Sequence, residues 1–239
     1  MTGRRFRVDR RVHLGDASSR GRLRLDALAA YLQDVAADDA EDAHLPEGRG
    51  WVLRRTALHV DRLPAIYEPV ELETWCSGVG RRWAERRTTL TANLGVGVRG
   101  VSVEATAVWV YVSLETGAPE PLPPEFFAVY GESADNRKVS VRLSHDEPPA
   151  SAARMAWPLR STDFDVFGHV NNCVYWVAVE DVLAARAPAA RITAAEIEFR
   201  GGIDPGERPE LVVVDGENSF AVWFQVGGQT RASGRVSLA

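Results

Sequence analysis

Residues 161–180, STDFDVFGHVNNCVYWVAVE, join a polar loop to a strongly apolar helical pattern. Asn171 and Asn172 are good N-cap residues, because a side-chain oxygen can accept a hydrogen bond from a free N–H group of the first helical turn. The apolar residues that follow recur at helical spacing: Tyr175, Ala178, Val179, Val182 and Leu183. The stretch therefore predicts a helix that begins at the two asparagines and buries one face.

The loop before this helix carries two carboxylates and an imidazole, on Asp163, Asp165 and His169. At a helix N-terminus, free N–H groups and the helix macrodipole favour negative charge. The loop is therefore a place where an oxyanion can be stabilised. A structural interpretation stays open, in which an aspartate caps a turn and His169 is a hydrogen-bonded structural histidine.

An earlier part of the chain repeats this pattern at a constant offset of 147 residues. Gly21 corresponds to Gly168, and Asp16 corresponds to Asp163. The matching apolar stripe comprises Leu28, Tyr31, Leu32, Val35 and Ala36. Asp34 likewise corresponds to Asp181. One offset that matches a stripe, a glycine and two acids indicates an internal duplication, so the two halves are expected to share one fold.

The two copies differ where chemistry is expected. Asp165 corresponds to Ser18 and His169 to Arg22, so only the second copy has the carboxylate and the imidazole. We therefore expect one active site per chain, at the N-terminus of the second helix.

Alternating or β-branched runs predict several strands after each helix. They lie at 51–63, 70–75, 87–94 and 101–114, and then at 191–199, 210–214, 220–226 and 230–238, with a first strand near 6–14. Between the halves, a short helix is expected at 124–130 and a strand near 139–143. The predicted class is α+β, each half an antiparallel sheet around one long helix, with domains at 1–131 and 153–239 and a linker at 132–152.

Composition narrows the classes of partner. The chain has 239 residues and a net charge of −5, which argues against nucleic acid as a partner. No run approaches the roughly 18 apolar residues of a membrane-spanning helix, and residues 1–15 lack an apolar signal segment, so no membrane partner and a cytoplasmic location are expected. Cys76 and Cys173 provide neither a disulfide framework nor a metal cluster, and no cofactor or metal is expected. Homodimer formation is left open.

The spacing D-x-D-x-x-G-H-V-N-N-x-x-Y-x-x-x-x-E in residues 163–180 resembles the active-site segment of hotdog-fold thioesterases. The wider chain is similar to acyl-ACP thioesterases, through LQDVA (32–36), WVLRRTALHVDRLP (51–64), VELETW (70–75) and residues 109–124. This resemblance implies a tandem (double) hotdog, with the first half shaping the acyl pocket. It also implies hydrolysis of acyl-ACP or acyl-CoA thioesters to a free fatty acid and the carrier thiol, as in fatty acid biosynthesis.

The resemblance places the catalytic carboxylate at Asp165, which acts either as a general base on water or as the attacking nucleophile. His169 would orient or share the proton, while Asp163 braces the loop. Cys173 is a rival nucleophile, although helical periodicity favours a packing role. Backbone N–H groups expected to polarise the thioester oxygen belong to Val170, Asn171 and Asn172.

Two departures from the plant-type pattern keep other functions open. The plant-type D-x-N-x-H becomes DVFGH, with Phe167 in place of the asparagine, and Y-R-R-E-C becomes FRGGI, with Gly202 and Ile203 in place of the acid and the cysteine. A phenyl ring cannot hydrogen-bond a carboxylate, and Glu196 and Glu198 are too loosely placed to be named as replacements. The alternatives are an acyl-thioester-binding hotdog with little or no turnover and a 2-enoyl-thioester hydratase.

Arginines crowd residues 4–24 and 81–87. They are either solvated strand faces or a docking surface for a phosphopantetheine phosphate or an acidic carrier protein.

Overall fold

The computed structural model describes residues 3–45, 49–95 and 97–239, so residues 1, 2, 46–48 and 96 of the predicted N-terminal domain lie outside it. The chain divides into two compact units, residues 1–142 and residues 143–239. This division falls inside the segment 132–152 that the sequence marks as a linker. The finer domain bounds, 1–131 and 153–239, stay a prediction.

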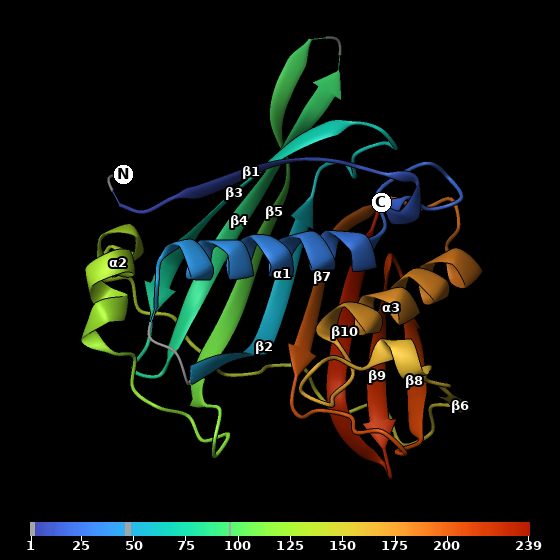
Figure 1. Ribbon diagram of the computed structural model, residues 1–239. Coiled ribbons are helices and arrows are strands. Elements are labelled where there is room, and N and C mark those ends of the chain that lie inside the picture. Colours follow the sequence, from blue (N-terminus) through green and yellow to red (C-terminus); the bar gives the residue numbers. More distant parts are fainter. Residues whose placement is uncertain (1–2, 46–48, 96) are drawn as a thin grey trace. The chain divides into compact units, whose positions relative to one another are not determined.

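The first unit is an antiparallel sheet with a long helix, α1 (Leu25–Asp42), on one face (Figure 1). The hydrogen-bonded strand order is β1-β3-β4-β5-β2. The strands are β1 (Phe6–Arg11), β2 (Arg49–Val60), β3 (Pro69–Val79), β4 (Trp83–Gly95) and β5 (Val98–Ser113). A shorter helix, α2 (Pro124–Ala134), contacts β3 and extends beyond the predicted 124–130.

The predicted apolar stripe of α1 is buried at Leu28, Tyr31 and Val35 and half-buried at Leu32 and Ala36. Removing this apolar surface from water is the main contribution that holds the helix on the sheet. The structure therefore confirms the stripe that the sequence predicted.

A buried carboxylate holds the C-terminal end of α1. Asp39 accepts hydrogen bonds from Arg4 Nε at 2.7 Å, from Arg86 Nη1 at 2.6 Å and from the Tyr130 hydroxyl at 3.0 Å. A buried charge is tolerated when it is paired and hydrogen-bonded, and this one ties α1 to β4 and α2.

The second unit repeats the arrangement with α3 (Asn172–Arg186) and an antiparallel sheet of order β7-β10-β9-β8-β6. Its strands are β6 (Arg154–Ala156), β7 (Ile192–Phe199), β8 (Pro209–Gly216), β9 (Ser219–Val226) and β10 (Gln229–Leu238). All five predicted stripe residues of α3 are buried. The Tyr175 ring lies 5.3 Å from Phe199 of β7 and 4.9 Å from Phe224 of β9, centroid to centroid, which fixes the first turns of α3 on the sheet.

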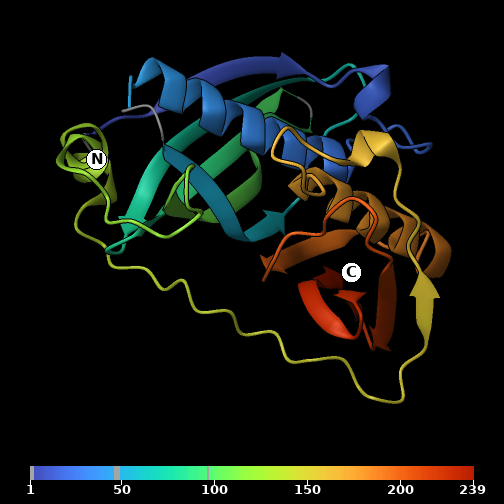
Figure 2. The ribbon, with the colours of Figure 1, turned by 60° about the horizontal axis from the view of Figure 1, so that its bottom comes forward.

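The segment between α2 and β6 corrects one prediction. The strand expected near 139–143 does not form, and Figure 2 shows the chain there without helix or strand. Only residues 137–139 bond to the end of β3, where Val79 N donates to Arg137 O at 2.9 Å and Val139 N donates to Val79 O at 3.3 Å. Two bonds at a strand end do not make a ladder. The three-residue strand β6, by contrast, was not predicted, because its residues are all exposed.

Among the described residues, no helix is long and apolar enough to cross a membrane.

Candidate functional site

The N-terminus of α3 is capped as the sequence predicts. Asn171 is the N-cap residue, and its side-chain oxygen accepts a hydrogen bond from Cys173 N at 2.9 Å. The loop before it contains a single 3-10 turn, η2 (Ser161–Asp163), and an isolated bridge between Phe164 and Val170. The loop carrying Asp165 and His169 therefore ends directly at the start of the helix.

Asp163 braces this loop. Its side chain is buried and accepts hydrogen bonds from Arg160 N at 2.7 Å and from the Arg160 guanidinium at 2.9 Å. Its carbonyl oxygen accepts from Asn171 N at 2.9 Å. All these bonds are local, which agrees with a structural role.

Asp165 lies half-buried at the base of a tight turn. Its N–H donates to His169 O at 2.9 Å, and its carboxylate Oδ1 accepts from Phe167 N at 2.9 Å. Gly168 closes the turn with a φ of 81°, a left-handed conformation that glycine adopts without a steric cost. The second carboxylate oxygen, Oδ2, has no hydrogen-bond partner in the described part of the chain, so it is the one available for chemistry.

Burial and the nearby charged groups shift the pKa of the Tyr175 phenol, near the start of α3. Burial raises the pKa of Tyr175; the nearby Arg231 lowers it, and the carboxylates of Glu207 and Asp165 raise it further. The net shift is upward, so the hydroxyl stays protonated near neutral pH.

The imidazole of His169 pairs with Asp204 rather than with Asp165. Its Nδ1 lies 2.7 Å from Asp204 Oδ1, and both side chains are more than half exposed. The ring rests against Gly202, where an added Cβ would lie 2.8 Å from Nδ1. Sequence reasoning identified Asp204 only as part of a turn, Asp204-Pro205-Gly206. The available signal was an acid two positions after Gly202, where the plant-type acid is missing.

The predicted oxyanion donors need correction. Val170 N already donates to Ile203 O at 3.0 Å, and Asn171 N already donates to Asp163 O at 2.9 Å. A donor held by a protein carbonyl is not available to a substrate. Of the three predicted donors, the N–H of Asn172 alone has no hydrogen-bond partner among the residues that the structure describes.

Two apolar side chains form the tip of the turn. Val166 is 94% exposed and Phe167 is 69% exposed. Phe167 occupies the position that the plant-type pattern gives to asparagine, and only its backbone N–H contacts Asp165. Its phenyl ring therefore does not reproduce the amide.

The first copy builds the same loop without the acid and the imidazole. The 3-10 turn η1 (Leu14–Asp16) corresponds to η2, 147 residues later. The isolated bridge Ala17–Leu23 corresponds in the same way to the bridge Phe164–Val170. Ser18 N donates to Arg22 O at 2.7 Å, as Asp165 N does to His169 O, and Gly21 has a φ of 72°. The loop conformation is thus common to both copies, whereas the carboxylate and the imidazole occur in the second copy alone.

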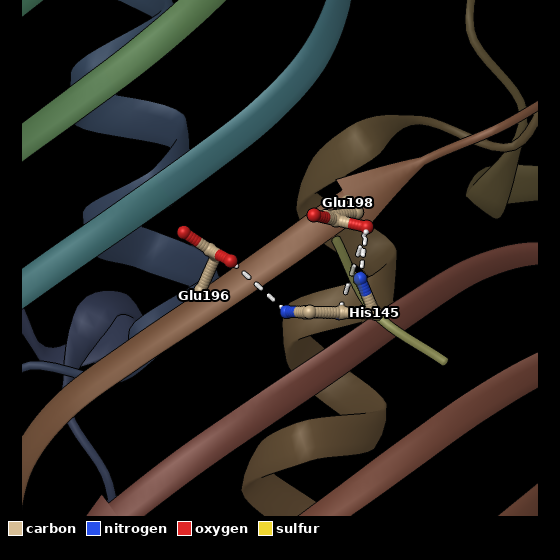
Figure 3. A group of neighbouring side chains, drawn as sticks. All are labelled: His145, Glu196 and Glu198. Carbon is tan, nitrogen blue, oxygen red and sulfur yellow. Dashed lines mark hydrogen bonds and ion pairs between the residues drawn. The ribbon is translucent and has the colours of Figure 1, made fainter. Parts of the chain in front are cut away.

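A cluster of His145, Glu196 and Glu198 has the residue types of a metal site, with ligand atoms within 4.8 Å of one another (Figure 3). Protein donors already occupy it, however. Glu198 accepts from Ser144 N at 2.6 Å and from His145 N at 3.0 Å, while His145 Nε2 pairs with Glu196 at 2.9 Å and Nδ1 with Ser233 at 3.0 Å. These bonds make the cluster a hydrogen-bond network that holds the segment around residue 145 on β7 and β10.

Most arginines of the two crowded stretches are ion-paired within the first unit. These are Arg4, Arg5, Arg7, Arg10, Arg24, Arg86 and Arg87. Arg81 and Arg82, at the turn between β3 and β4, are exposed and have no ion-pair partner in the described residues. Arg20 is likewise exposed without an ion-pair partner in the described residues, and these three arginines are the ones best able to meet an external anion.

Comparison with known proteins agrees with this architecture. The acyl-ACP thioesterase N-terminal domain matches residues 3–130, and the acyl-ACP thioesterase C-terminal domain matches residues 146–227. An uncharacterized protein of Mycobacterium tuberculosis is 29% identical over 224 residues, covering 93% of this chain and 88% of its own. A chloroplastic oleoyl-acyl carrier protein thioesterase of Coriandrum sativum is 29% identical over 177 residues, covering 64% of this chain and 47% of its own.

Two solved structures resemble the whole chain. An acyl-ACP thioesterase from Bacteroides thetaiotaomicron has a TM-score of 0.84 at 21% identity and covers 98% of each chain. The 12:0-ACP thioesterase from Umbellularia californica has a TM-score of 0.83 at 21% identity and covers 100% of this chain and 98% of its own. At this identity the likeness concerns the fold, and it confirms the predicted α+β double-hotdog class.

Proposed function

Since the chain belongs to the acyl-ACP thioesterase family, a family of thioester hydrolases, we propose that it hydrolyses an acyl thioester of acyl carrier protein or CoA. The products are a free fatty acid and the carrier thiol, and the setting is fatty acid biosynthesis in the cytoplasm. The observation that carries the proposal is the duplicated loop, whose second copy alone adds a carboxylate and an imidazole at a capped helix N-terminus.

The chemistry follows from the atoms left available at this loop. The thioester oxygen lies at the Asn172 N–H, where the helix N-terminus stabilises the negative charge of the tetrahedral intermediate. Asp165 Oδ2 takes a proton from the water that attacks the carbonyl carbon. The carbon–sulfur bond then breaks, and the proton, which His169 orients or shares, passes to the leaving thiolate. Direct attack by the carboxylate would use the same oxygen.

The decisive test is steady-state thiol release from acyl-ACP and acyl-CoA with one preparation of the wild-type protein. The proposal predicts turnover of at least one carrier, with one free acid formed per thiol. Tight binding of both thioesters without thiol release would instead support a non-catalytic acyl-thioester-binding protein. Loss of a 2-enoyl substrate by hydration, with the thioester intact, would support a hydratase.

We expect Arg81 and Arg82 to contribute to recognition of an acidic carrier, so KM for acyl-ACP should rise with salt. Exposed charges are screened beyond a Debye length of roughly 8 Å at physiological ionic strength. An Arg81→Ala/Arg82→Ala variant should have a higher KM at low salt and a flatter salt dependence. Arg87→Ala is the matched control, because Arg87 is already paired with Glu104 at 3.1 Å. A wild-type KM that does not change with salt would remove these arginines from the proposal.

A further inference from the structure

We propose that Asp204 is a positioning residue that holds the His169 imidazole in one tautomer and orientation for the reaction. The inference rests on the proposed function for its catalytic meaning, but its structural part can be tested without any substrate. The His169–Asp204 pair is defined by the 2.7 Å contact between Nδ1 and Oδ1.

The contact dictates where the proton lies on the ring. An ionised carboxylate only accepts hydrogen bonds, so Nδ1 of His169 must be the donor. In the neutral ring, Nε2 then carries the lone pair and can accept a proton.

Two backbone features bring the pair together. Val170 N donates to Ile203 O at 3.0 Å. Val170 directly follows His169 and Ile203 directly precedes Asp204, so this bond brings the two side chains close together. The Asp204 N–H donates to Glu207 Oε2 at 2.8 Å, and Glu207 in turn pairs with Arg231 at 3.0 Å. The backbone that carries the carboxylate is therefore fixed on both sides.

Gly202 determines where the ring can rest. An added Cβ at this position would lie 2.8 to 3.2 Å from three atoms of the His169 ring, closer than ordinary contact distances. Any side chain at position 202, including an acid there, would displace the imidazole. Gly202 therefore leaves room for the imidazole, and the carboxylate that pairs with it comes from Asp204, two positions further along the chain.

The first copy again serves as an internal comparison. In its turn at Ala65–Glu68, Ala65 N donates to Glu68 Oε2 at 2.8 Å, as Asp204 N does to Glu207 Oε2. Leu23 N donates to Pro64 O at 2.8 Å, as Val170 N does to Ile203 O. An isolated bridge joins Arg22 to Ala65, the positions that correspond to His169 and Asp204. The turn and the loop thus form without a histidine–aspartate pair, so folding alone does not account for it.

The test compares two variants. Asp204→Ala introduces the alanine that the first copy has at the corresponding position, Ala65, and Asp204→Glu is the conservative variant. Nitrogen-15 chemical shifts of the imidazole should show His169 protonated on Nδ1 in the wild type, and a mixture of tautomers in Asp204→Ala. In the thiol-release assay, Asp204→Ala should lower kcat about tenfold and leave KM unchanged. The loss is smaller than the 10²–10⁴-fold expected for a directly acting group, because the His169–Asp204 pair is exposed to solvent. Asp204→Glu should restore part of kcat.

The matched control is Asp61→Ala, which removes the acid of another exposed pair, His59–Asp61, at 3.7 Å. It should leave kcat and the His169 shifts unchanged. Wild-type kcat and an unchanged His169 tautomer in Asp204→Ala would overturn the inference. Absence of thioesterase activity in the wild type, with the tautomer change present, would overturn the proposed function and leave the pair intact.

Discussion

Replacing Asp165 by asparagine is expected to lower thioesterase kcat by at least about two decades, because a positioned acid or base contributes on the order of 10²–10⁴-fold. Asparagine keeps an oxygen that can accept from Phe167 N, so the turn should survive. The amide cannot take a proton from water or attack a carbonyl. Thiol release gives the activity, and a thermal melt followed by circular dichroism reports on the fold.

Two variants serve as controls for this result. Ser18→Ala alters the corresponding position of the first copy and should keep full activity. Cys173→Ala should lose little, because the known role of Cys173 in the cap uses its backbone N–H. Near wild-type turnover in Asp165→Asn would remove Asp165 from the site, and complete loss in Cys173→Ala would point to the cysteine as nucleophile.

The largest expected effect on stability comes from Glu198→Gln. The wild-type carboxylate has 0% exposure and accepts from Ser144 N, His145 N and the Ser144 hydroxyl. Glutamine replaces one acceptor with an NH₂ group that faces these donors, so N–H groups lose their partner. Leaving buried polar groups unpaired should lower the free energy of unfolding by about 3 kcal/mol. The corresponding fall in Tm is roughly 6–12 °C for a chain of this size.

The stability lost in Glu198→Gln should depend on pH. Burial alone would raise the pKa of Glu198, but the N–H groups of Ser144 and His145 outweigh it, and the pKa lies below its ordinary value of 4.5. A carboxylate with a depressed pKa stabilises the fold above its unfolded-state pKa, and this contribution is lost as pH falls through the folded-state pKa. The difference in Tm between wild type and variant should therefore be full at neutral pH and shrink below pH 4.5.

Glu196→Gln is the matched control on the same strand. Its side chain is 30% exposed, and an amide oxygen can still accept from His145 Nε2. The loss of stability should therefore be clearly smaller than for Glu198→Gln. Equal Tm values for the two variants would contradict the assignment of Glu198 as the anchor of residues 144 and 145.

The local features of the fold were predictable from sequence. The helix at Asn172–Arg186, its cap at Asn171 and its buried stripe all follow from spacing over a few residues, and the structure has each of them. The duplication was also predictable, because a constant offset of 147 aligns loop and helix together. The prediction of a strand at 139–143 was wrong, because the hydrogen bonds between this segment and β3 end at Val139 and do not extend into a ladder.

The details of the site depend on contacts between distant segments, which spacing does not encode. Asp204 lies 35 positions from His169, and only the folded turn brings the two together. The donors at Val170 and Asn171 are occupied by carbonyls of Ile203 and Asp163, which could not be read from local pattern. His145 was missed because a lone histidine in a polar segment gives no sign that it is buried.

Giving the second loop the side chains of the first shows whether the chain has its one active site in the second copy of the duplicated loop. The variant is Asp165→Ser/His169→Arg, and the measurement is kcat/KM for thiol release beside Tm. Because Ser18 and Arg22 already support the same backbone turn, Tm should stay within a few degrees of wild type. Activity should fall by at least about two decades in this folded protein. A folded variant with wild-type kcat/KM would show that the chemistry does not depend on Asp165 and His169 and would place the active site outside this loop.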